Sequence, residues 1–84
     1  MITHSQILWR CRRGMLELDL LLQHYANRHY RDAPEWLQKQ FILLLDESDQ
    51  DLQGWLLNGE QTFSLMVADI IAEISGMELS SVTA

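Results

Sequence analysis

The spacing of apolar residues constrains the fold of this chain more than any other feature of its sequence. In several short segments an apolar residue recurs every three or four positions, which is the period of a helix that buries one face. The most regular series consists of Phe63, Met66, Val67, Ile70, Ile74 and Met77. No stretch alternates apolar and polar residues at the period of two that a half-buried strand shows. The sequence therefore predicts an all-α fold.

Helix-capping residues divide the chain into five predicted helices. The helices are expected at about residues 4–13, 15–27, 33–46, 49–58 and 63–76. Thr3 and Gln6 have the form of a capping box at the start of the first helix. Asp32 is the expected N-cap of the third helix, with Pro34 in its first turn. Asp49 is the expected N-cap of the fourth.

Glycines mark two of the expected helix ends. Gly14 is expected to end the first helix, because glycine readily takes the left-handed conformation that closes a helix. The apolar positions on both sides of Gly14 stay in helical phase, so one bent helix is an alternative to two. Gly76 is the expected end of the fifth helix. Residues 79–84 are expected to form a frayed tail.

Length and composition suit a single small domain. The chain has 84 residues, of which 48% are hydrophobic and 21% are charged, so one globular core is expected. We therefore predict a single-domain bundle of five helices over residues 1–84, with Trp36 and Trp55 in the core. Most apolar side chains are needed to close such a core, which leaves little room for an enclosed active site. The lack of room for an enclosed active site favours a binding protein over an enzyme.

Charge is distributed unevenly along the chain, whose formal net charge is −6. Residues 1–31 carry five arginines and two carboxylates, whereas residues 32–84 carry Lys39 and ten carboxylates. A nucleic-acid-binding protein needs a clustered basic surface to neutralise phosphates. We therefore expect no binding to nucleic acid, and a small DNA-binding helical domain is disfavoured.

Three features favour a soluble protein of a reducing compartment. Cys11 is the only cysteine, so no disulfide can form within the chain. No apolar run reaches the ~18–20 residues that a membrane span requires, so no membrane insertion is expected. A helix cap within the first few residues leaves no room for a signal or transit peptide. The cytoplasm is the expected location.

Other candidate sites are weak. Residues 49–60 follow the frame of a calcium-binding EF-hand loop, but Gln53 replaces the usual aspartate or asparagine, and Trp55 and the two leucines after it are the apolar residues that a short buried helix needs. No two histidines have the i, i+4 spacing that places two ligands on one helix face. Cys11 lies on the apolar stripe and is expected as a core residue rather than a nucleophile. No metal ligand, catalytic residue or cofactor-binding residue is assigned.

Charged residues gather around Gly14, between the first two predicted helices. Two arginines precede this glycine, and two carboxylates fall in the first turn of the next helix. Capping explains part of this pattern, but the density of charge exceeds what caps require. Trp9 lies one residue off the apolar stripe, and an exposed tryptophan beside arginine is typical of binding hot spots. The candidate partner-binding residues are Trp9, Arg10, Arg12, Arg13, Gly14, Glu17 and Asp19.

Two blocks of this sequence resemble a known family. Residues 11–19, Cys-Arg-Arg-Gly-Met-Leu-Glu-Leu-Asp, resemble the signature of small bacterial flavinylation factors. These factors help to attach FAD covalently to the flavoprotein subunit of succinate dehydrogenase and fumarate reductase. A second block, at residues 41–45, 49–52 and 55–56, is similar to the other recurrent pattern of the family. Gln50 stands where the family often has proline, and residues 58–84 match loosely.

The resemblance implies a five-helix assembly factor, or chaperone, for the immature flavoprotein subunit. It implies no enzymatic activity and no stably bound FAD, because the partner's own histidine and flavin form the bond. It implies that Arg13, Gly14 and Glu17 are the functional motif. Arg13 would pair with a carboxylate or phosphate, Glu17 would accept hydrogen bonds, and Gly14 would let the partner backbone come close. The alternative is a helical protein-interaction module of antitoxin-like or other regulatory type.

Overall fold

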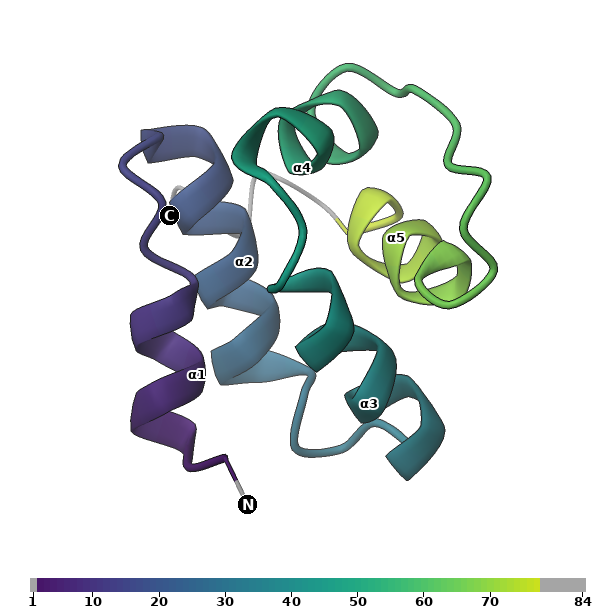
Figure 1. Cartoon of the computed structure of the whole chain (residues 1–84). Coiled ribbons are helices and arrows are strands. Elements are labelled where there is room, and N and C mark those ends of the chain that lie inside the picture. The colour runs from purple at the N-terminus through teal and green to yellow at the C-terminus, as the bar shows by residue number, and fades with distance from the viewer. Residues whose placement is uncertain (1, 78–84) are drawn as a thin grey trace.

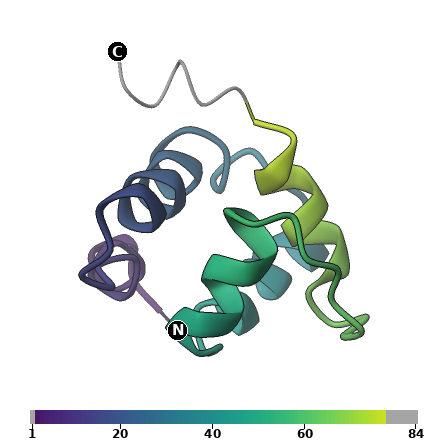
Figure 2. The same cartoon turned by 90° about the horizontal axis from the view of Figure 1, so that it is seen from above.

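The computed structural model describes residues 2–77, which form five α-helices and no strand. The helices are α1 (His4–Arg10), α2 (Leu16–Arg28), α3 (Glu35–Leu44), α4 (Asp49–Leu56) and α5 (Ala68–Ser75). Helices α1 and α2 lie side by side and run in opposite directions, and the other three helices gather beyond α2 (Figures 1 and 2). The predicted all-α single domain is confirmed. The prediction of a frayed tail lies outside the described residues.

The core lies between α2 and α5. Helix α2 contacts α1, α4 and α5, and helix α5 also contacts α3 and α4, so these two helices together touch all the others. The buried apolar residues are Ile7, Cys11, Leu18, Leu21, Leu22, Tyr25, Ala26, Leu37, Phe41, Leu44, Leu45, Leu52, Leu56, Val67, Ile70, Ile71 and Ile74. Within residues 2–77, no helix is both long and apolar enough to cross a membrane.

The first helix begins as predicted but ends earlier. The Thr3 hydroxyl accepts the Gln6 N–H at 3.2 Å and the Gln6 side chain accepts the Thr3 N–H at 2.9 Å, which confirms the capping box. Helix α1 ends at Arg10 with Cys11 as its C-cap, so the prediction that Gly14 ends this helix is wrong. Gly14 is left-handed, with φ +85°, but it lies in the link between two separate helices. The bent single helix is therefore excluded.

Two predicted N-caps are wrong by one or two residues. Pro34 rather than Asp32 occupies the N-cap position of α3, because its φ of −62° and ψ of 154° already fit the extended cap conformation. Ser48 rather than Asp49 caps α4, and its hydroxyl accepts the Asp51 N–H at 3.1 Å. Residues 49–56 are helical, so they do not form the loop of an EF-hand.

Helix α5 begins five residues later than the apolar series predicts. Phe63 is 98% exposed and precedes the helix, and Met66 is exposed as well. The beginning of the helix is fixed from α3. The Gln40 side chain accepts the Ile70 N–H at 3.0 Å and donates to the Asp69 carboxylate at 3.0 Å. A cap from a distant helix therefore sets this boundary.

The tryptophans differ from the predicted core positions. Trp36 is 56% exposed, so its prediction as a core residue is wrong. Helix α3 buries Leu37, Phe41 and Leu44, and position 36 is turned about 100° away from that face. Trp55 is half-buried and packs against the core.

Candidate functional site

The α1–α2 link (residues 11–15) is held by the first turn of α2. The Asp19 carboxylate accepts the backbone N–H of Arg13 at 2.7 Å and that of Gly14 at 3.1 Å. Helix α2 has Met15 at its N-cap, which makes no side-chain capping bond, so Asp19 reaches back over the helix start instead. Together with the left-handed Gly14, these two bonds fix the shape of the link.

Arg13 points into the protein rather than into solvent. Its side chain is 16% exposed, and its guanidinium donates to the backbone oxygens of Leu45 and Glu47 and to the Asp49 carboxylate. The bonds to Glu47 and Asp49 are 3.3 and 3.2 Å long. Arg13 thus ties the α1–α2 link to the α3–α4 link (residues 45–48).

A second ion pair joins the end of α1 to the α3–α4 link. Arg10 Nη1 lies 3.3 Å from Asp46 Oδ1, and both side chains are exposed, so the pair contributes roughly 0–1 kcal/mol. A shallow hollow of about 270 Å³ lies between the two links. Its lining consists of Trp9, Arg10, Arg12, Arg13, Leu45 and Asp46.

Both apolar and charged side chains are exposed at and beside the α1–α2 link. Trp9, for which the sequence leaves both a core position and partial exposure open, is 71% exposed, and Leu16 is 75% exposed. Arg12, Gly14 and Glu17, between or beside them in the sequence, are exposed as well. Leu16 was not among the candidates. Its position could have suggested it, because it lies about 200° around the helix from Leu18, the first residue of the buried stripe of α2.

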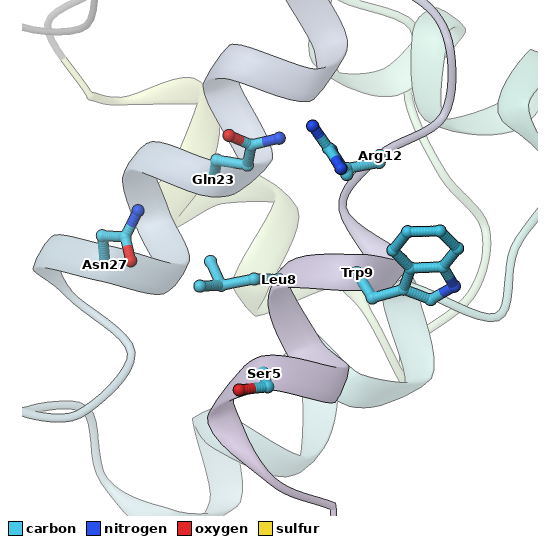
Figure 3. A pocket seen from close by; sticks show the side chains of 6 residues that line it. All are labelled: Ser5, Leu8, Trp9, Arg12, Gln23 and Asn27. Carbon is cyan, nitrogen blue, oxygen red and sulfur yellow. The ribbon is translucent and has the colours of Figure 1, made fainter.

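A second hollow lies in the groove between α1 and α2 (Figure 3). Its volume is about 350 Å³, and its lining consists of Ser5, Leu8, Trp9, Arg12, Gln23 and Asn27. The side chains of Arg12 and Gln23 point toward one another across its upper edge, while Leu8 lies below them (Figure 3). Both ends of this edge therefore carry N–H donors, which suit an anionic or carbonyl oxygen of a partner.

Cys11 is a core residue, as predicted. Its side chain is fully buried, and burial raises the pKa of the thiol to about 12, although the positive charge of Arg13 opposes the shift. The thiol is therefore protonated near neutral pH, and it is inaccessible to a substrate. Among residues 2–77, no group of three or more His, Cys, Asp or Glu residues is arranged to hold a metal ion.

Fold and surface together define a small helical protein that exposes a tryptophan, a leucine and an arginine at or beside the link between its first two helices. The chain matches the model of the family described as "Flavinator of succinate dehydrogenase" over residues 5–78. It belongs to that family, and the resemblance seen in the two sequence blocks is confirmed.

Similar curated proteins are named FAD assembly factor SdhE. The one from Legionella pneumophila (strain Paris) is 46% identical over 57 residues, which cover 68% of this chain and 72% of that protein. The one from Coxiella burnetii is 38% identical over 80 residues, which are 95% of each chain. The one from Vibrio cholerae is 33% identical over 78 residues, covering 93% of this chain and 91% of that protein. No solved structure matches this chain.

Proposed function

We propose that this protein is an assembly factor that binds the immature flavoprotein subunit of succinate dehydrogenase and promotes covalent attachment of FAD. Membership of the flavinator family and the names of its relatives support this function. The observation that carries the proposal is the exposure of Trp9, Leu16 and Glu17, which lie just before and just after the α1–α2 link; we take them together as a docking face. We extend the proposal to fumarate reductase and to action in the bacterial cytoplasm.

The exposed face supplies binding energy to the partner. Trp9 and Leu16 offer apolar surface whose burial contributes roughly 25 cal/mol for each Å². Within residues 2–77, the exposed side chains of Arg12 and Glu17 make no hydrogen bond or ion pair, so Arg12 suits a bidentate contact with a carboxylate or phosphate and Glu17 can accept hydrogen bonds. The open space around Gly14 lets a partner backbone approach, since a Cβ added there would have no neighbour within 4 Å.

The covalent step belongs to the partner in this proposal. The flavoprotein's own histidine and its flavin supply the atoms that form the bond, and this chain holds the flavoprotein in the reactive geometry. The protein itself is then not an enzyme and has no stably bound FAD. A titration of the purified protein with free FAD should give weak binding or none.

Two pairs of variants test the docking face. Trp9→Ala and Glu17→Ala should lower both the affinity for the apo-flavoprotein and the rate of covalent flavinylation. Trp36→Ala and Glu35→Ala are the matched controls. Trp36 is likewise exposed, and Glu35 lies in the first turn of α3 as Glu17 lies in the first turn of α2. Covalent flavin is read as fluorescence of the denatured flavoprotein.

The outcome separates the proposed function from a regulatory one. Normal flavinylation by folded Trp9→Ala and Glu17→Ala proteins would contradict the proposed docking face. A wild-type protein that neither binds the flavoprotein nor raises its flavin content would contradict the function itself. Recovery of another protein in place of the flavoprotein would then favour a regulatory interaction module.

A further inference from the structure

The α3–α4 link has no part in the proposed docking face, yet it lies between two parts of the second block of the family resemblance. Two arginines bind it: Arg13 of the α1–α2 link and Arg10 at the end of α1. Arg13 donates to two backbone oxygens of the link and to Asp49 just beyond it, and Arg10 pairs with Asp46. The residues in each of these bonds are 32 to 36 apart in sequence, so these side chains close a large loop of the chain.

Arg13 is poorly placed to meet a partner directly. Both of its Nη atoms already donate within the chain, its side chain is largely buried, and its Nε is buried without an acceptor among the described residues. Arg12, the preceding residue, is exposed. Neighbouring arginines of one motif thus point in different directions.

We infer that Arg13 is a positioning residue: it holds the α3–α4 link against the α1–α2 link, and the hollow between them receives an anionic side chain of the flavoprotein. This inference rests on the proposed function. The hollow has Arg12 as its exposed cation, Trp9 as its apolar wall and Leu45 and Asp46 from the opposite link. Arg10 is partly neutralised by Asp46. A carboxylate of the partner would therefore bind Arg12.

Substitution of Asp49 distinguishes a positioning role of Arg13 from a direct contact with the partner, because the two roles predict opposite changes in affinity. If Arg13 met the partner's carboxylate, Asp49→Asn would free Arg13 for that contact and strengthen binding. If Arg13 holds the α3–α4 link, the same variant loosens the link and weakens binding. The bond is one partly exposed ion pair, so we expect the dissociation constant to rise about two- to five-fold.

Asp51→Asn is the matched control for Asp49→Asn. It removes the same charge from the same first turn of α4, and the Asp51 side chain has no ion pair within residues 2–77. The comparison therefore cancels the general effect of removing a negative charge near the hollow. The affinity of each variant for the purified apo-flavoprotein is measured by calorimetry. Weaker binding by Asp49→Asn than by Asp51→Asn supports the inference, and equal or stronger binding overturns it.

The salt dependence of binding supplies an independent readout. An arginine that pairs with a partner's carboxylate makes the affinity fall with ionic strength, so Arg12→Gln should flatten that dependence. The control is Arg31→Gln, which removes one positive charge from an exposed site outside the hollow. Arg13→Gln should weaken binding, but the salt dependence of its affinity should be as steep as that of the control. A slope flattened equally by Arg12→Gln and Arg13→Gln would overturn the inference.

Failure of the proposed function gives a different result. In that case the wild-type protein does not bind the flavoprotein, and no slope or dissociation constant is measured for any variant. If the wild-type protein binds the flavoprotein but Asp49→Asn does not bind more weakly than Asp51→Asn, only the role of Arg13 is overturned. Asp49→Asn keeps the test decisive even if Arg13→Gln does not fold.

Discussion

Replacement of Gly14 by alanine isolates the backbone geometry of the α1–α2 link. Gly14 has φ +85°, and an added Cβ would meet nothing within 4 Å. The methyl group therefore causes no clash, and the only cost is conformational. Gly59 offers a matched control, because it has φ +71°, the same open surroundings and a position in the segment between α4 and α5.

The expected cost of each substitution follows from the left-handed backbone. An L-residue in this region costs about 1–2 kcal/mol relative to glycine. For a domain of this size, each kcal/mol lowers the melting temperature by about 4–8 °C. Gly14→Ala and Gly59→Ala should therefore destabilise the protein by similar amounts, read from thermal or urea unfolding.

Function should distinguish the two variants. A shifted link would misplace the hydrogen bonds from Arg13 and Gly14 to Asp19 and so change the docking face, whereas Gly59 lies outside it. We expect slower covalent flavinylation with Gly14→Ala and wild-type rates with Gly59→Ala, at protein concentrations where both are folded. Equal flavinylation by the two variants would refute the functional reasoning. Unchanged stability of both would refute the conformational reasoning.

Three further predictions concern single side chains. Asp19→Asn leaves one of two backbone N–H groups of the link without its acceptor and should lower the free energy of unfolding by about 1 kcal/mol, whereas the exposed Asp32→Asn should not. Cys11 should be alkylated only after unfolding. Because its folded pKa is raised from 9.0 to about 12, stability should fall as pH rises between these values, and less so in Cys11→Ala. Tyr25→Phe should be neutral or stabilising in urea unfolding, since the buried Tyr25 hydroxyl has no partner among residues 2–77; clear destabilisation would contradict this.

Local patterns were sufficient to predict the fold class and part of the candidate site. The capping box of Thr3 and Gln6 places every bonding group within four residues, so its geometry follows from the sequence. The apolar stripe of α2 likewise indicates its buried face. These are the features in which neighbours along the chain are also neighbours in space.

Helix boundaries that depend on distant residues were not predictable in this way. Phe63 and Met66 keep the helical spacing of α5, and periodicity alone cannot tell where along such a series the helix begins. Gln40, from α3, caps the first turn of α5 and decides this point. Its partners are 29 and 30 residues away, so the sequence around Gln40 does not predict these contacts.

The sequence by itself determined that this protein is helical, that it belongs to the flavinator family and that its charged motif surrounds Gly14. Only the tertiary structure decided that Arg13 and Arg12 point in different directions. Two of the acceptors of Arg13 are backbone oxygens, at Leu45 and Glu47. Every residue has a backbone carbonyl oxygen, so the sequence does not indicate which of these oxygens accept hydrogen bonds from a distant arginine. The packing of the two links determines the acceptors.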